Sequence, residues 1–487
     1  MWPQPLPFAA SLLALAFLTA CQTTTIFTAS TVKIPQAFDQ AQAARGSAET
    51  GNWWRQWNDP VLTALIEQGL QQSHNIRIAQ SRLQEARANT RLADADKGPT
   101  VGLSANAARL DASIRNPLNE QARTALAQIP QASSLGQRNI SLESDSFTGG
   151  FSASWEPDIF GKKRSDADAA RYAQMGAQEQ VYGAQMLVAG EIAENYFKAR
   201  AAQARLKTAE RTTATLQRMV RYVEGRFQAG HVSAYEVNQA RSQFTATQAR
   251  QSTLSAEYAA YVRSIAVLTG QAPQGFKLPD SRADILAAQA DAPSGQTPSG
   301  MLERRPDIRA QAAQVNAYAA KLASAKADLL PRFTISFLSQ GTINVDSDFK
   351  SWSNLISAGI QLPIFTNGRI KANIAAADAR LQTALLQYDQ TVLKALGDVD
   401  SAYQTHSALN RQNSLLQTAH QQAAKQASDS EKLFRYGNKT LDEALRAQLG
   451  EQEMQDALIQ SRLARAQTLV GLYKALGGGW TATRQDQ

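Results

Sequence analysis

The chain has 487 residues, of which 43% are hydrophobic, 19% charged and 7% aromatic. This composition is too apolar for an intrinsically disordered chain, and the length allows several domains or one extended unit. The formal charge of +8 comes from 50 basic and 42 acidic residues that are mixed along the chain, so we expect no nucleic-acid partner. A single cysteine excludes an internal disulfide and a zinc site built from cysteines.

An apolar stretch from Phe8 to Thr19 lies near the start of the chain. It is shorter than the roughly 20 residues of a transmembrane helix and has the length of the apolar part of a signal peptide. It ends in Leu18-Thr19-Ala20-Cys21, which resembles the lipobox of bacterial lipoproteins. We therefore expect residues 1–20 to be removed and a covalent lipid to be attached to Cys21. By analogy with that class, Gln22 directs the lipoprotein to the outer membrane. The alternative is an incidental cysteine in an ordinary signal peptide.

No later segment is long and apolar enough for a transmembrane helix, so we expect further membrane contact through β-strands or surface binding. Residues 21–97 are expected to hold the lipidated N-terminal segment and a first short helical region. Residues 98–160 and 331–363 each contain two segments in which apolar and small residues alternate. The alternating positions are Val101, Leu103, Ala105 and Ala107; Phe147, Gly149, Phe151, Ala153 and Trp155; Phe333, Ile335 and Phe337; and Ile356, Ala358, Ile360 and Leu362.

Period-two segments of about ten residues with one apolar face are typical of transmembrane β-strands. The sequence therefore predicts two β-hairpins in the outer membrane, with the polar residues 116–146 as a long external loop of the first. Four strands of a soluble sheet are the alternative. An open sheet edge is not tolerated in lipid, and the smallest ordinary barrels have 8 strands. Four strands per chain thus predict an oligomer whose subunits share one barrel.

Two proline-free tracts, between Pro157 and Pro273 and after Pro363, are rich in helix-forming residues. A helix over residues 162–228 would be about 100 Å long. Each tract contains a glycine that is followed by a hydroxyl residue and a glutamate, which predicts a helix end and a sharp turn. We expect long helical hairpins at 161–270 and 364–476, an equatorial linker at 271–304, a helix at 305–330 and a tail at 477–487.

The two halves of the chain repeat each other. Gly161 and Gly368, Tyr196 and Tyr403, and Gly230 and Gly437 are each 207 positions apart, which indicates a gene duplication without insertions in the long helices. Upstream matches are 232 positions apart, so the segment that contains the strands is 25 residues longer in the first half.

Four motifs carry a resemblance to a known family. They are Trp53-Trp54-Arg55-Gln56-Trp57-Asn58-Asp59-Pro60-Val61-Leu62, Trp155-Glu156-Pro157-Asp158-Ile159-Phe160-Gly161, Leu302-Glu303-Arg304-Arg305-Pro306-Asp307-Ile308 and Leu472-Tyr473-Lys474-Ala475-Leu476-Gly477-Gly478-Gly479-Trp480. With the order of elements, they are similar to the TolC-type outer-membrane factors, and in particular to the NodT-like efflux lipoprotein branch. The resemblance implies a mostly α fold with transmembrane β: a duplicated unit of two strands and a long helical hairpin. It also implies a homotrimer with a shared 12-stranded β-barrel and a periplasmic α-helical barrel.

The implied function is a passive outer-membrane conduit of a tripartite efflux system. Its partners would be a periplasmic adaptor (membrane fusion) protein and an inner-membrane efflux transporter. The alternatives are a type I secretion exit duct and a lipid-anchored periplasmic coiled-coil scaffold without a channel. No enzymatic role is expected, because the four histidines are scattered and no HExxH, GxSxG or phosphate-loop motif is present. We expect no metal and no cofactor apart from the lipid on Cys21.

The resemblance also suggests two sites at the far ends of the helical hairpins. The tips would meet the hairpin of the adaptor through Gly230, Val232, Ser233, Gly437, Lys439, Thr440 and Leu441; alternatively, each glycine is only a helix cap. A periplasmic gate would lie at the end of the second tract and use Asp429, Lys432, Arg435 and Tyr436, with three copies of Asp429 near the symmetry axis. The alternative for these charges is a solvated helix face.

Overall fold

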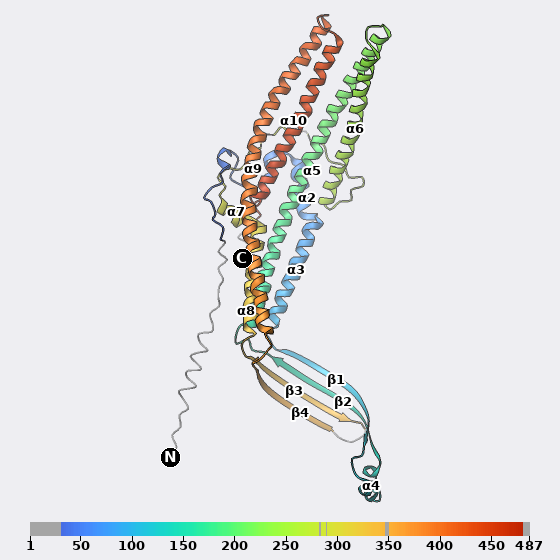
Figure 1. The fold of residues 1–487 in the computed structure, drawn as a ribbon, viewed down its shortest axis with the longest axis vertical. Helices are drawn as coiled ribbons and strands as arrows, with labels where there is room; N and C mark the ends of the chain where they lie inside the picture. The colour runs from blue at the N-terminus through green and yellow to red at the C-terminus, as the bar shows by residue number, and fades with distance from the viewer. Residues whose placement is uncertain (1–30, 282–283, 289, 346–349, 481–487) are drawn as a thin grey trace. The chain divides into compact units, whose positions relative to one another are not determined.

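The computed structural model of the protein describes residues 31–281, 284–288, 290–345 and 350–480. Cys21 and the expected signal segment 1–20 lie outside the described residues. The helices are α2 Pro60–Gln72, α3 His74–Ala95, α4 Glu120–Ala127, α5 Lys162–Gln228, α6 Ala234–Leu268, α7 Pro298–Arg304, α8 Pro306–Ala327, α9 Arg369–Arg435 and α10 Leu441–Ala475, with short 3-10 turns at Ala41–Ala43, Trp53–Trp57 and Ser133–Gly136 (Figure 1). The strands are β1 Thr100–Arg115, β2 Asn139–Trp155, β3 Arg332–Asn344 and β4 Lys350–Gln361.

The duplication predicted from the sequence is visible in the lengths of the helices. Helices α5 and α9 have 67 residues each, and α6 and α10 have 35 residues each. Each long helix is followed by its shorter partner after a tight turn, and α7 lies inside the segment 271–304 that we expected to be a linker. Among the described helices, none combines the length and the apolar character needed to cross a bilayer.

The described residues form two compact units. The first contains Ala88–Arg171 and Ala317–Leu381, and the second contains the described parts of Phe27–Arg87, Tyr172–Asn316 and Gln382–Gln487. The first unit is built on one antiparallel sheet with the strand order β1-β2-β3-β4. All four strands pair along the chain order, and the register aligns Ala108 of β1 with Ser146 of β2 and Asn344 of β3.

The end of the loop expected at 116–146 is wrong, because β2 already begins at Asn139, and the connecting segment contains the helix α4. The side chain of Asn116 orders this segment. Its Nδ2 donates to the carbonyl oxygens of Leu135 at 2.6 Å and Gln137 at 2.8 Å, and its Oδ1 accepts from the amide of Leu118 at 3.0 Å. The side chain of Asn119 accepts from the amide of Ala122 and caps α4. A polar sequence is thus held in a compact fold by hydrogen bonds that its composition does not reveal.

The core of the second unit gathers three of the four sequence motifs. Trp53 stacks on Tyr473 with ring centroids 5.6 Å apart, and Trp54 stacks on Trp480 at 5.8 Å. Arg305 of the third motif donates to the carbonyl oxygen of Ala475 in the fourth at 2.9 Å. Large aromatic side chains provide much of the area that a core can remove from water. The motifs therefore mark the place where the N-terminal segment, the linker region and the C-terminus pack together.

Asp59, which is only 1% exposed, connects several segments of this core through hydrogen bonds. It begins α2 by accepting from the amides of Val61 and Leu62, with Pro60 at the first helical position. Its other oxygen accepts from the hydroxyl of Tyr196 on α5 at 2.8 Å and from that of Ser281 at 3.0 Å. Burial raises the pKa of Tyr196 to about 12, so the phenol keeps the proton that it donates.

Candidate functional site

The sheet of the first unit has two chemically different faces. The register places the odd-numbered residues of β1, β2 and β3 on the same face as the even-numbered residues of β4. Over the four-stranded part, this face carries large apolar side chains that are exposed to solvent in the single chain, among them Val101, Leu103, Phe147, Phe151, Trp155, Ile335, Trp352, Ile356 and Ile360. Leu103 is 87% exposed. A sheet face of this kind suits contact with lipid acyl chains.

The opposite face carries small polar side chains. Thr148 and Thr342 share a hydrogen bond of 3.2 Å between their hydroxyl oxygens, and Ser336 and Ser357 share one of 2.6 Å. The cross-strand pair Leu338 and Leu355 is an exception on this face. The predicted alternation is therefore present in three dimensions, with one side suited to lipid and the other to water.

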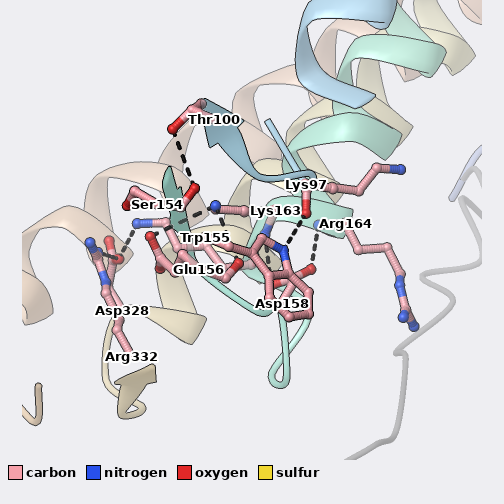
Figure 2. A network of polar contacts seen from close by, with 11 residues as sticks. Lys97, Thr100, Ser154, Trp155, Glu156, Asp158, Lys163, Arg164, Asp328 and Arg332 are labelled. Carbon is pink, nitrogen blue, oxygen red and sulfur yellow. Dashed lines mark hydrogen bonds and ion pairs between the residues drawn. The ribbon is translucent and has the colours of Figure 1, made fainter. Parts of the chain in front are cut away.

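A polar network surrounds the point where the strands meet the helices of the first unit (Figure 2). The indole Nε1 of Trp155 donates to the carbonyl oxygen of Lys97 at 3.0 Å. Asp158 accepts from the backbone amides of Lys163 at 3.0 Å and Arg164 at 2.7 Å, which satisfies two free N–H groups at the start of α5. The motif Trp155–Gly161 thus serves as the connection between strand β2 and helix α5.

Asp328, at the end of α8, joins the two halves of this network. Lys162 of α5 and Arg332 of β3 both donate to its carboxylate. Partial burial alone would raise the pKa of Asp328, but the hydrogen bonds from Lys162 and Arg332 and their positive charges outweigh it, so the pKa lies below its usual value. The carboxylate stays ionised and connects the start of α5 to the start of the second β-hairpin.

The two helical hairpins of the second unit end in the same turn. After α5, the amide of Gly230 donates to the carbonyl of Phe227 and the amide of His231 donates to that of Arg226; after α9, Gly437 and Asn438 repeat both bonds. This is the Schellman arrangement, in which the glycine takes a positive φ. The values are +76° for Gly230 and +78° for Gly437, so both glycines are the helix caps that the sequence predicts.

The hydroxyl residues at the tips begin the following helices. Ser233 and Thr440 each form a capping box with the glutamate three residues later, Glu236 and Glu443. The hydrogen bond from the Ser233 hydroxyl makes the largest contribution to lowering the pKa of Glu236, and the backbone amide of Thr440 does the same for Glu443. These two candidate docking residues therefore have a structural task in the single chain.

The remaining tip residues differ in exposure. Val232 and Leu441 are half-buried against a small cluster that joins the two hairpins and contains Met219, Val223, Val237, Ala240 and Leu445. Lys439 donates to the hydroxyl of the buried Ser430 at 3.3 Å. The large exposed side chains at the tips include three aromatic residues that the sequence did not assign to docking, namely Phe227, Tyr235 and Phe434. Tyr235 is 73% exposed.

Three of the residues expected to form a gate, Asp429, Lys432 and Arg435, lie in the last two turns of α9, and Tyr436 directly follows its end. All four are exposed. Asp429 pairs with Lys432 at 3.7 Å, and Arg435 pairs with Glu431 at 3.6 Å. Both ion pairs lie within the same helix, so in the single chain Arg435 does not reach a neighbouring helix. Tyr436 is 81% exposed.

A ladder of polar contacts between α5 and α10, which the sequence did not reveal, connects the two hairpins. Arg205 pairs with Asp456 at 2.7 Å, Arg211 pairs with Glu451 at 2.8 Å, Thr215 accepts from Gln452 at 3.1 Å, and Arg218 donates to Gln448 at 2.7 Å. Arg211, Thr215 and Arg218 follow one another at spacings of four and three, which places them on one face of α5, and this is the only local signal. Their partners are more than 200 residues away in the chain.

Comparisons with known proteins agree with this geometry. The sequence profile of the outer membrane efflux protein family matches residues 65–271 and 297–478. The chain is 29% identical over 469 residues to the pyoverdine export outer membrane protein OpmQ of Pseudomonas putida, covering 96% of each chain. It is 26% identical over 487 residues to the cation efflux system protein CusC of Escherichia coli, covering 97% of this chain and 99% of the relative.

The fold is similar to that of a solved outer-membrane channel. The structure of OprN superposes with a TM-score of 0.77 at 25% sequence identity, over 93% of this chain and 100% of that one. The profile match covers well over half of the residues, and it includes the strands, the long hairpins and the tips described above. This chain therefore belongs to the outer membrane efflux protein family and is the outer-membrane channel component of an efflux system that extends into the periplasm.

Proposed function

We propose that three copies of this chain form a passive conduit that is anchored by a lipid on Cys21 and is joined at its hairpin tips to a periplasmic adaptor and an inner-membrane transporter. The observation that carries the proposal is the open sheet of the first unit. Among the described residues, strands β1 and β4 each have one edge without a neighbouring strand, while the apolar face is exposed. Unpaired backbone groups cost several kcal/mol each in lipid, about 2–7 kcal/mol by transfer scales, so the edges must pair with other copies.

The number of copies follows from the width of the resulting barrel. Two copies would give 8 strands, and a barrel of that size has an interior just wide enough to be filled by side chains. Three copies would give 12 strands, with room for water inside. The inner lining would be the face of serine, threonine, asparagine and glutamine residues. A lining of small polar groups suits the passage of hydrated solutes without a binding step.

The tips provide a docking surface for the adaptor. A groove of about 410 Å³ runs between the first hairpin and α10, and its lining includes Tyr222, Arg226, Val232, Glu236 and Arg446. The groove is lined by both apolar and charged side chains, which suits the side chains of an incoming amphipathic helix. The exposed aromatic residues Phe227, Tyr235 and Phe434 border the same turns and would add apolar area to the contact.

The exported substrate is not encoded in an obvious binding site. The relatives carry names that refer to pyoverdine export and to cation efflux, so members of similar sequence serve different cargoes. We propose that the transporter and the adaptor select the substrate and that this chain supplies the exit. A periplasmic scaffold without a channel would have no use for the exposed apolar face of the sheet.

Electrophysiology tests the conduit. The full-length lipoprotein, purified in detergent, should migrate as a trimer in native mass spectrometry and should produce discrete conductance steps in planar lipid bilayers. Protein that stays monomeric and never conducts would refute the proposal. As a control, Ile356→Asp places a charge on the lipid side of β4, where a charge near the bilayer centre costs about 2–4 kcal/mol, and should reduce insertion. Ser357→Asp, on the opposite face, should insert normally.

The lipid anchor is tested separately. Mass spectrometry of the mature N-terminus should show acylated Cys21 as the first residue. A terminus elsewhere, or an unmodified thiol, would refute the anchor but would leave the conduit intact. Replacing Cys21 by Ala should retain the protein in the signal-bearing form.

A further inference from the structure

The first hairpin extends beyond the four-stranded sheet, and the extension has an inverted chemical pattern. Strands β1 and β2 have 16 and 17 residues, whereas about 9–11 residues suffice for a transmembrane strand. The four-stranded part ends where Ala108, Ser146 and Asn344 align. Residues 109–115 and 139–145 continue as a two-stranded ribbon, which we call the external arm and which ends in the segment that carries α4 (Figure 1).

In the four-stranded part, odd-numbered residues of β1 such as Val101 and Leu103 form the apolar face, and even-numbered residues such as Ser104 and Asn106 form the polar face. In the arm the pattern is reversed. The odd positions are polar or charged, namely Arg109, Asp111, Ser113 and Arg115, and the even positions are apolar, namely Leu110, Ala112 and Ile114. Arg109 also faces Asp145 of β2 across 3.9 Å.

In the conduit proposed above, the charged face of the arm would lie at the outer boundary of the bilayer. Charges on the lipid side of a strand are costly at the midplane and cost little near the interface. The change at Arg109 therefore coincides with the point at which the strands leave the hydrocarbon. The apolar face of the arm continues the water-facing side of the sheet, so lipid does not cover it. Within the chain it stays open, since Leu110 is 55% and Ile114 is 52% exposed.

We propose that the external arms of three copies pack against one another through Leu110, Ala112 and Ile114 and form an apolar constriction over the outer end of the pore. The proposal rests on the trimeric conduit proposed above. A second copy is the occupant that the geometry favours, because the covering surface must lie on the lumen side of the sheet. In the described part of the second hairpin, β3 ends at Asn344 and β4 begins at Lys350, without such an extension. Each chain therefore supplies one arm, and the three arms are related by the same axis as the pore.

The dimensions are compatible with this arrangement. Twelve strands about 4.8 Å apart and tilted by about 40° close a ring with a radius of about 12 Å. The arm has seven residue pairs, which at about 3.3 Å per residue give a length of about 23 Å. An arm that leans inward is therefore long enough to reach the axis. An apolar constriction of this kind restricts the flow of ions by excluding water.

Two neighbouring residues on opposite faces of the arm provide a matched test. In planar bilayers, Ile114→Asp should raise the single-channel conductance of the full-length protein by about two-fold or more, because a charge admits water to the constriction. Ser113→Asp adds the same charge to the outer face and should conduct like the wild type. Ile114→Cys should form a disulfide-linked dimer of chains under mild oxidation, whereas Ser113→Cys and the wild type should not.

The outcomes separate this inference from the conduit itself. If the wild type conducts, but Ile114→Asp conducts no better and Ile114→Cys does not cross-link, the arms stand apart and the inference is overturned while the conduit remains. If Ile114→Cys cross-links but Ile114→Asp has wild-type conductance, the arms touch without closing the pore, and the constriction is refuted. A wild type that neither conducts nor forms trimers refutes the conduit, and this inference with it.

Discussion

Arg211 of α5 donates a hydrogen bond of 2.8 Å to Glu451 of α10, and this ion pair joins the first helical hairpin to the second. The other carboxylate oxygen of Glu451 lies 3.2 Å from Nε2 of His420 on α9. Glu451 is buried, whereas Arg211 is more than half exposed. The carboxylate of Glu451 therefore relies on these two side chains for its hydrogen bonds, whereas the guanidinium of Arg211 can also bind water. Three helices from both halves of the chain meet at this one side chain.

Removing the arginine should destabilise this contact. Arg211→Ala leaves the buried carboxylate of Glu451 without its main charged partner, which we expect to cost about 1–3 kcal/mol. The thermal unfolding midpoint of the purified protein measures the effect. Arg446→Ala removes an exposed pair within one helix, with Asp442, and should cost at most about 0.5 kcal/mol. Equal losses in the two variants would show that the connection between hairpins adds nothing.

Loss of the charge at Asp429 tests the proposed gate. Three copies of this carboxylate near the axis would attract cations and oppose close approach of the hairpins. Asp429→Ala should therefore weaken the cation preference of the pore and raise its resting conductance in planar bilayers. Glu257→Ala removes the same charge from an exposed position of α6 and serves as the control. Selectivity and conductance equal to those of the control would assign Asp429 to a solvated helix face.

Substitutions of Gly437 test whether the tip of the second helical hairpin contributes to docking. A Cβ atom at this position would meet no neighbour within 4 Å, so the cost of a side chain comes from the positive φ of +78° alone. Gly437→Val should destabilise the turn by about 1 kcal/mol or more and impair export in cells. Gly437→Asn should be tolerated better, because asparagine adopts this conformation more readily. If Gly437→Val still assembles and supports full efflux, docking through this residue is wrong.

Because His406 is buried, we expect the stability of the protein to depend on pH. The side chain is buried on α9; burial, followed by the positive charge of Arg465, lowers its pKa below the ordinary value, although the charge of Asp291 acts in the opposite direction. The unfolded chain therefore binds a proton more readily than the folded chain near pH 6.5, so stability falls as the pH drops through this range. The thermal midpoint should decrease between pH 7.5 and 5.5.

His406→Gln should reduce this decrease, since glutamine does not titrate. Asn410, which contacts Nδ1 of His406 at 3.3 Å, stays in place in that variant. His74→Gln changes a histidine at the exposed start of α3 and provides the control. An unchanged pH profile in His406→Gln would assign the pH dependence to other groups.

The sequence alone determined the features that depend on neighbours along the chain. Alternation in β1 to β4 predicted the two faces of the sheet, because side chains of a strand point to opposite sides in turn. The proline-free tracts predicted the long helices, and Gly230 and Gly437 predicted their ends, because a glycine lowers the cost of a positive φ wherever the turn occurs. The equal spacing of the two halves predicted the equal lengths of their helices.

Only the tertiary structure decided which distant residues meet. The fold of the segment after β1 depends on Asn116 reaching carbonyl groups about 20 residues away, and the α5–α10 ladder joins residues more than 200 apart. The half-buried positions of Val232 and Leu441 and the pairing of Arg435 within its own helix also had no local signal. The residue pattern specifies which face of an element is apolar. The partner of a polar or charged side chain depends instead on how the elements pack, because many chemically equivalent partners are available along the chain before packing selects one.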